Sequence, residues 1–242
     1  MNPPQLLFLH GFGENHQVWD DFLPNFEWKY AIHCPNYADW TDCLTLEDYA
    51  VKIMSNLPDQ SFFYVLGHSM GGYIALELVK LFPDKIVKVV MLNSSAFPDS
   101  DQKKLNRDKT IQFLRNFGTE KFIDLFIPNL FSPEFSALQP EILAQLIQRY
   151  QSLSPDGLMV ATLAMKNRMD GRELLKITRV PFLFIHGKQD TLVALEDIQA
   201  CVDINTSLHQ LAIFDQTGHQ ATYEEPQNCM EKITQFLNLN NG

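Results

Sequence analysis

A serine with a glycine two positions before it and another two positions after it is the residue that most directly suggests chemistry. The segment reads Gly67-His68-Ser69-Met70-Gly71-Gly72. An apolar run at 62–66 precedes it, and apolar residues at helical spacing follow it. At so sharp a strand-to-helix turn the hydroxyl is lifted clear of the sheet, and the helix N-terminus places partial positive charge where an oxyanion would form. Ser69 is therefore a candidate nucleophile, although the glycines taken alone would also fit close packing.

Three other segments carry chemically useful residues immediately after an apolar run. They are His10-Gly11-Phe12-Gly13, Asp190 and His219. The carboxyl ends of parallel strands meet at one edge of a sheet, so these segments are expected to converge with Ser69. A serine hydroxyl needs a base within hydrogen-bond reach, and that base needs an acid that fixes its tautomer. The pattern predicts Ser69 as nucleophile, His219 as base and Asp190 as acid.

Two backbone amides, those of Phe12 and Met70, are predicted to form the oxyanion hole. Two further carboxylates are candidates for the acid. Asp215 lies only four residues before His219, on the same turn, and Asp170 lies toward the end of the helical stretch 99–178. Both therefore rank behind Asp190.

The remaining histidines at these turns are assigned structural roles. His10 is expected to hold residues 10–13, which we call the oxyanion loop because they include the predicted donor Phe12. His68 and His186 are expected to serve packing.

The elements that must position these residues alternate between strand and helix patterns. Strands are predicted at 6–9, 30–34, 62–66, 86–92, 180–185 and 210–214, and helices at 46–57, 73–82, 194–201 and from 226 onward. This alternation predicts an α/β fold with a mostly parallel, doubly wound sheet of about six strands.

One long stretch breaks the alternation. Residues 99–178 show no strand pattern, recurrent helical spacing, and many phenylalanines and methionines. We expect an all-helical insert of three to five helices within a single core domain formed by 1–98 and 179–242.

Composition excludes several classes of protein and site. With a net charge of −10 and no basic run longer than Lys103-Lys104, the chain is not expected to bind nucleic acid. It lacks an N-terminal signal pattern and a membrane-length apolar run, and its four cysteines (Cys34, Cys43, Cys201, Cys229) form no CxxC pair. We therefore expect a cytoplasmic protein with reduced thiols. No HExxH spacing and no complete dinucleotide fingerprint is present, so neither a metal nor another cofactor is predicted.

The order serine, acid, histidine, with a helical insert before the acid, resembles the lid-bearing serine hydrolases and esterases of the α/β-hydrolase fold family. The likeness rests on the segments 10–13, 67–72, 181–190 and 218–219, and it spans nearly the whole chain. It implies the same roles for Ser69, Asp190 and His219, with Phe12 and Met70 as amide donors. Family members usually begin with an antiparallel hairpin that this sequence lacks, so a trimmed sheet is expected.

The resemblance implies a serine hydrolase that cleaves a small carboxylic ester with an apolar acyl or alcohol part. Carbon-carbon bond hydrolysis, thioester cleavage and a lyase reaction with His219 as base stay open. Haloalkane dehalogenase and epoxide hydrolase chemistry is disfavoured, because those relatives carry an aspartate where this chain has Ser69. A small-molecule receptor with slow turnover is the alternative from another class. The sequence leaves the oligomeric state open.

Overall fold

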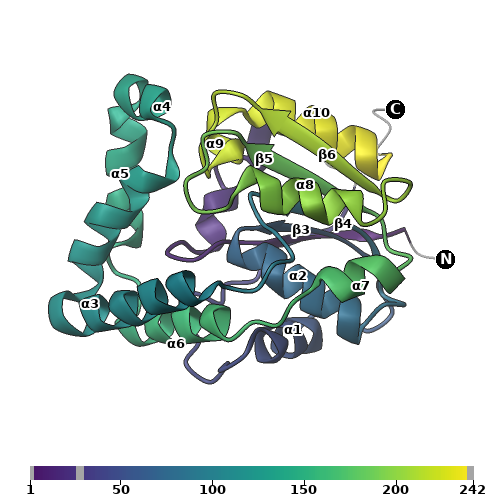
Figure 1. Ribbon diagram of the computed structural model, residues 1–242, viewed down its shortest axis with the longest axis horizontal. Helices are drawn as coiled ribbons and strands as arrows, with labels where there is room; N and C mark the ends of the chain where they lie inside the picture. Colours follow the sequence, from purple (N-terminus) through teal and green to yellow (C-terminus); the bar gives the residue numbers. More distant parts are fainter. Residues whose placement is uncertain (1–2, 26–29, 239–242) are drawn as a thin grey trace.

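Parallel strands form the centre of the molecule (Figure 1). The computed structural model describes residues 3–25 and 30–238. Within these ranges six strands are ordered β2-β1-β3-β4-β5-β6, and every neighbouring pair is parallel. The strands are β1 (Gln5–Leu9), β2 (Ile32–His33), β3 (Phe63–His68), β4 (Ile86–Leu92), β5 (Phe182–Gly187) and β6 (His209–Phe214). The predicted α/β fold with a sheet of about six strands is confirmed.

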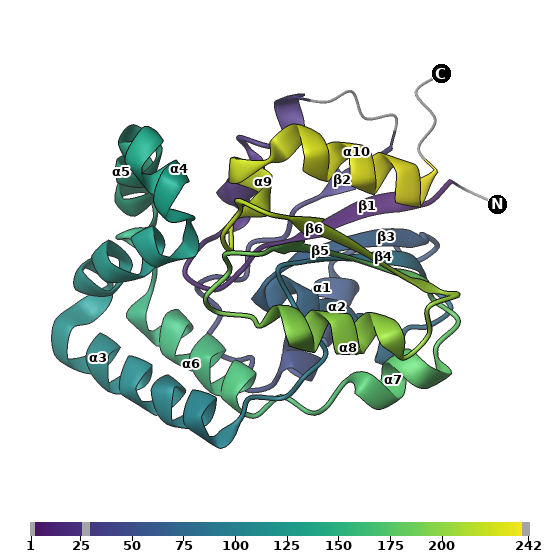
Figure 2. The same ribbon diagram turned by 45° about the horizontal axis from the view of Figure 1, so that its top comes forward.

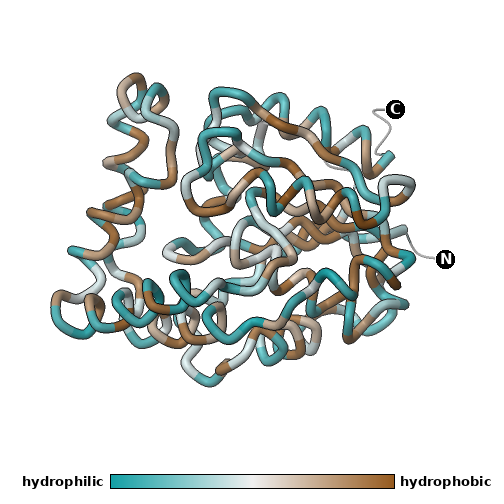
Figure 3. Tube along the Cα trace, viewed as in Figure 1, coloured by the Kyte–Doolittle hydropathy of each residue, from teal (hydrophilic) through white to brown (hydrophobic). Residues whose placement is uncertain are grey.

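The four central strands bury side chains on both faces of the sheet, because successive side chains point to opposite sides. In β1, Leu7 and Leu9 join one apolar cluster, and Leu6 and Phe8 join the other. The first cluster is covered by α1 (Leu46–Ser55), α2 (Met70–Leu81) and α8 (Leu195–Asp203), and the second by α10 (Pro226–Leu237). Figure 2 shows these helices on the two sides of the sheet, which makes it doubly wound. The hydropathy trace is correspondingly brown along the central strands (Figure 3).

Local signals explain where the first helices begin. Thr45 accepts a hydrogen bond from the Asp48 amide, and the Asp48 carboxylate accepts one from the Thr45 amide, which is the capping box expected for α1. Helix α2 begins directly after Ser69, and it ends at Leu81, before Pro83.

Between β4 and β5 the described chain is helical. The elements are α3 (Asp101–Phe126), the 3-10 helix η3 (Ile127–Leu130), α4 (Pro133–Leu138), α5 (Pro140–Tyr150), α6 (Pro155–Lys166) and α7 (Arg172–Ile177). Prolines at the first turns of α5 and α6 and the Ser154 side-chain cap agree with the sequence pattern. Figure 1 shows α3 to α6 on one side of the sheet domain. We call residues 99–178 the helical segment; its division from the core as a separate lid stays a prediction.

Several elements differ from the sequence pattern in their bounds. Strand β2 is shorter than the expected 30–34, and β3 continues two residues beyond 66 because Gly67 and His68 still pair with β4. Helix α3 contains a break at Gly118, with φ 77° and ψ 178°. The short elements η1 (His16–Trp19), η2 (Leu23–Asn25) and α9 (Ala221–Glu224) were not predicted, because three or four residues carry no usable periodicity.

Every helix in the described residues is too short or too polar to cross a membrane. Cys34, Cys43, Cys201 and Cys229 are all free thiols.

Candidate active site

Ser69 occupies a strained turn between β3 and α2. Its φ of 50° and ψ of −113° are rare for a residue with a side chain. Backbone bonds hold it there: its amide donates to the Leu92 carbonyl at 2.9 Å, and its own carbonyl accepts from the Ser94 hydroxyl at 2.8 Å. A Cβ on Gly71 would collide with the carbonyl of Leu9. The second glycine of the motif is therefore required for α2 to approach β1.

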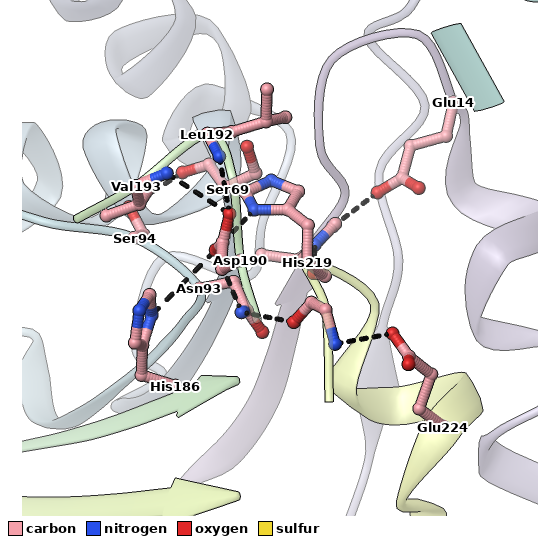
Figure 4. Close-up of polar contacts among 12 residues, drawn as sticks. Glu14, Ser69, Asn93, Ser94, His186, Asp190, Leu192, Val193, His219 and Glu224 are labelled. Atoms are coloured by element: carbon pink, nitrogen blue, oxygen red, sulfur yellow. Dashed lines mark hydrogen bonds and ion pairs between the residues drawn. The ribbon is translucent and has the colours of Figure 1, made fainter. Parts of the chain in front are cut away.

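Asp190 and His219 meet beside this turn (Figure 4). Asp190 follows β5 and His219 follows β6, so the two neighbouring strand ends bring them together. Nδ1 of His219 lies 2.7 Å from Oδ2 of Asp190, and both side chains are buried. A carboxylate only accepts, so His219 carries its proton on Nδ1 and leaves Nε2 free to act as a base.

Hydrogen bonds hold Asp190 in its ionised form. Its Oδ1 accepts from the amides of Leu192 at 2.8 Å and Val193 at 3.1 Å, and its Oδ2 accepts from Asn93 Nδ2 at 3.0 Å. Burial alone would raise the pKa of this carboxyl, but His219 and these donors outweigh burial and lower the pKa to about 2. Asp190 is thus a permanent anion beside His219 at neutral pH.

Asn93 is a site residue that the sequence analysis missed. It follows β4 with a positive φ of 48°, and its side-chain amide donates both to Asp190 and to the Gly218 carbonyl at 3.0 Å. It therefore ties the acid to the turn that carries His219. The signal available in the sequence was an asparagine at a strand end, a residue type that tolerates positive φ.

Ser69 points toward the His219 ring in Figure 4. Within the described part of the chain, the Ser69 hydroxyl and His219 Nε2 make no hydrogen bond, nor do the amides of Phe12 and Met70. Contacts of this kind are often long in ligand-free enzymes and tighten when substrate binds. The predicted hydroxyl, base and oxyanion donors are thus all unoccupied by other protein groups.

The helical segment contacts the His219 turn directly. The His219 amide donates to the Leu130 carbonyl at 2.7 Å. The Glu224 carboxylate accepts from the amides of both Ser132, at 3.1 Å, and Gly218, at 2.9 Å. Burial raises the pKa of Glu224, although these donors act against it. Residues 130–132 therefore stay joined to the core at the base of the site.

An aromatic cluster covers the oxyanion loop. The ring of Phe12 lies 5.7 Å from that of Phe122 and 5.5 Å from that of Phe126, both on α3. Gly13, with a φ of 76°, leaves room for this contact, because a Cβ there would lie 2.7 Å from the Phe126 ring. The helical segment thus places apolar side chains against the loop that carries a predicted oxyanion donor.

His10 has the structural role expected of it. Its ring stacks on Tyr37 with centroids 3.7 Å apart, and its Nε2 accepts from the Tyr37 amide at 3.3 Å. Burial lowers the pKa of His10 to about 4, so the ring is neutral.

His68 does more than pack, in contrast to its expected role. Its Nδ1 lies 2.6 Å from Oε1 of the buried Glu14, and its Nε2 lies 3.0 Å from the His219 carbonyl. Glu14 received no role in the sequence analysis.

The competing acids lie elsewhere. Asp215 pairs with Lys188 at 3.1 Å on the surface, and Asp170 pairs with Arg172. His186 is buried, and its Nδ1 lies 3.8 Å from Asp190. In the described residues no group of His, Cys, Asp or Glu side chains is arranged to hold a metal ion.

Comparisons with known proteins agree with this architecture. A family model described as alpha/beta hydrolase fold matches residues 4–226. The pimeloyl-[acyl-carrier protein] methyl ester esterase of Aromatoleum aromaticum is 28% identical to this chain, and the match covers 95% of this chain and 96% of that protein. The esterase of the same name from Vibrio atlanticus is 27% identical, and the match covers 96% of this chain and 94% of that protein. The structure of a thermophilic esterase from Thermogutta terrifontis superposes with a TM-score of 0.88 at 23% identity, over 98% of this chain and 90% of that one. The chain belongs to the α/β hydrolase fold family.

Proposed function

We propose that this protein is a serine esterase that cleaves a small carboxylic ester with an apolar acyl or alcohol part. The observation that carries the proposal is the 2.7 Å hydrogen bond between His219 and the ionised Asp190, formed at neighbouring strand ends beside Ser69. The strained turn at Ser69 and the two amides without protein acceptors support the same assignment.

In the first half of the proposed reaction, the Ser69 hydroxyl attacks the ester carbonyl carbon while His219 Nε2 takes its proton. The carbonyl oxygen becomes an oxyanion that accepts from the amides of Phe12 and Met70. The intermediate then collapses, the carbon-oxygen ester bond breaks, and His219 returns the proton to the departing alkoxide.

In the second half, water attacks the acyl-serine and His219 takes one proton from it. The tetrahedral intermediate releases the carboxylic acid, and the proton returns to the Ser69 oxygen. Asp190 stays ionised throughout, because its task is to stabilise the imidazolium form of His219.

The helical segment would act as a lid that shapes the substrate pocket. Its Phe122 and Phe126 pack on Phe12, whose own amide is a proposed oxyanion donor, so a bound acyl chain would meet aromatic side chains close to the reacting carbon. This arrangement favours apolar over charged substituents next to the carbonyl.

The relatives suggest which alcohol to test first. Two proteins that match this chain over more than nine-tenths of its length are methyl ester esterases by name. A methyl group is the smallest alcohol part, and we propose that methyl esters of medium-length acids lie within the substrate range.

The test is hydrolysis of p-nitrophenyl and methyl esters of increasing acyl length by the wild type and by Ser69→Ala. We expect Ser69→Ala to lower kcat by at least about 1,000-fold without loss of folding. Ser136→Ala, on α4 of the helical segment, is the matched control and should leave kcat unchanged. Equal hydrolysis by wild type and Ser69→Ala would refute the proposal. Ligand binding by a wild type that does not turn over would support a receptor instead.

A further inference from the structure

A buried acid and a buried histidine connect three loops of the site, and neither takes part in the reaction proposed above. Glu14 is 2% exposed and His68 is 3% exposed. They are 54 positions apart in sequence, and their side chains meet at 2.6 Å. Burying a charged or polar group without partners is costly, so both side chains are expected to be fully hydrogen-bonded.

Glu14 accepts three hydrogen bonds from three parts of the chain. Its Oε1 accepts from the Gly11 amide, in the oxyanion loop, at 2.6 Å and lies against His68. Its Oε2 accepts from Gln220 Nε2 at 2.9 Å, directly after His219. Figure 4 shows the Glu14 carboxylate beside the His219 loop. One carboxylate therefore contacts the oxyanion loop, the residue before the nucleophile, and the residue after the base.

The partners of His68 fix its protonation. Its Nε2 faces the His219 carbonyl at 3.0 Å, and a carbonyl only accepts, so Nε2 carries a proton. Its Nδ1 faces Glu14, which also accepts from Gly11 and Gln220 and stays ionised at neutral pH, because its pKa is lowered to about 2. An ionised carboxylate only accepts, so Nδ1 carries a proton as well. An imidazolium donating at both nitrogens satisfies every contact.

We propose that Glu14 and His68 form a buried carboxylate-imidazolium pair that positions the oxyanion loop and the His219 loop relative to Ser69. Both are positioning residues, since neither contacts the reacting atoms. The inference rests on the proposed esterase function for its kinetic consequence, whereas the charge state of the pair can be tested without any activity.

Replacing Glu14 or His68 removes at least one of the hydrogen bonds that join the loops. In Glu14→Gln, His68 loses its counter-ion and becomes neutral, with one ring proton for two acceptors. It must then give up either the contact to position 14 or the one to the His219 carbonyl. The Gln220 amide can rotate to pair with the new glutamine, because its Oε1 is buried without a partner in the described structure. The substitution therefore perturbs the His68 link most.

The kinetic experiment compares wild type, Glu14→Gln, His68→Gln and the double variant on one p-nitrophenyl ester. We expect each single variant to lower kcat by about 10- to 100-fold with KM changed by less than about threefold, since misplacing aligned groups acts on the chemical step. The double variant should fall little further than either single variant, because both remove the same link.

His209→Gln is the matched control. His209 is also 2% exposed, and its Nε2 also contacts a backbone carbonyl, that of Leu175 at 3.1 Å, but it lies outside the site. Its loss should lower the melting temperature to a similar extent and leave kcat within about twofold of wild type. Equal kcat losses in His68→Gln and His209→Gln, or additive losses in the double variant, would overturn the positioning role.

A second measurement judges the pair even if the variants fail to fold or the wild type hydrolyses no ester. NMR of the histidine ring nitrogens at about pH 8, well above the ordinary histidine pKa of about 6.5, should show one doubly protonated ring. His68→Gln or Glu14→Gln, where folded, should remove that signal. Only neutral rings in the wild type would refute the charge pair. Absent hydrolysis together with the imidazolium signal would refute the esterase proposal and retain the pair.

Discussion

The loops at the strand ends and the helical segment are held in place by different kinds of contact. At the strand ends, short hydrogen bonds between buried polar groups join Asp190 to His219 and Glu14 to His68. In the helical segment, aromatic rings pack against one another, as in the stacked pair Phe122 and Phe126 with centroids 5.1 Å apart. Hydrogen bonds are directional, whereas ring packing constrains volume more than angle. Changes at the strand ends should therefore alter rate, and changes in the helical segment should alter which substrate fits.

The segment is not loosely attached, however. At its root the buried Asp99 pairs with Arg107 of α3 at 3.1 Å and with Arg168, just after α6, at 2.6 Å. Arg168 also lies over the Tyr73 ring of α2, 4.1 Å from its centroid. These contacts of Asp99 and Arg168, together with the hydrogen bonds at 130–132, fix the segment at two places. Any opening is expected to involve the part between them rather than the whole segment.

The largest expected effect is that of Asp190→Asn. An amide cannot hold His219 in the required tautomer, and its own N–H would oppose the Asn93 donor, so kcat should fall by about 10,000-fold. Asp215→Asn is the control, because that exposed carboxylate pairs with Lys188. Steady-state kinetics of both variants decides between the two acids. Equal losses of kcat in Asp190→Asn and Asp215→Asn would contradict the assignment of Asp190 as the acid.

Acid should destabilise the strand-end loops through Glu14. Burial would raise the pKa of this carboxyl, but His68, Gln220 and Gly11 outweigh burial and lower it from its ordinary 4.5 to about 2. The resulting stability is present above pH 4.5 and is lost as the pH falls toward 2. The loss is on the order of 3 kcal/mol in the free energy of unfolding. Melting temperatures from pH 7 downward should converge for wild type and Glu14→Gln; parallel curves would contradict the coupling.

Gly13 in the oxyanion loop and Gly118 in the helical segment both have a positive φ, so alanine at each position compares the two regions. Gly118→Ala should cost about 1 to 3 kcal/mol in unfolding free energy through backbone strain alone, because no atom outside the adjoining backbone lies within 4 Å of the added Cβ. Gly13→Ala adds a collision with Phe126 and should also lower kcat. Thermal unfolding and kinetics of both variants test the contrast. A loss of kcat in Gly118→Ala as large as that in Gly13→Ala would argue against it.

The smallest expected effect concerns selectivity. Phe126→Leu removes a ring next to Phe12, and the ratio of kcat/KM for octanoyl over acetyl esters should rise about tenfold. Leu125→Ala changes the neighbouring residue, which is 60% exposed, and should leave the ratio unchanged. A change in kcat for all esters alike in Phe126→Leu would mean that this ring positions the oxyanion loop instead.

Much of this architecture could be predicted because its signals are local. Apolar runs of strand length, the capping box at Thr45 and the glycines around Ser69 each constrain their own neighbourhood. Parallel strand ends then bring Asp190 and His219 together without any knowledge of packing. Periodicity likewise predicted three to five helices in 99–178, where the described residues form the five α-helices α3 to α7 and the short η3.

The Glu14–His68 pair could not be predicted, because it depends on which distant side chains share one buried volume. The sequence predicted a packing role for His68 and no role for Glu14. A usable signal was present, however. His68 lies within a glycine-rich motif and Glu14 directly follows another, and glycines that allow close approach make burial of an ionisable residue without a partner costly. The break at Gly118 also could not be predicted. A single glycine inside a helical pattern is usually tolerated and seldom breaks the helix.

The most direct test of the central claim is the intact mass of the protein after incubation with a fluorophosphonate. The account predicts one adduct on the wild type, none on Ser69→Ala, and much slower labelling of Asp190→Asn, because only an activated serine hydroxyl reacts rapidly. Peptide mapping should place the adduct on Ser69. An adduct of equal yield on Ser69→Ala, or none on a folded wild type, would contradict the assignment of Ser69, His219 and Asp190 as a working nucleophilic site.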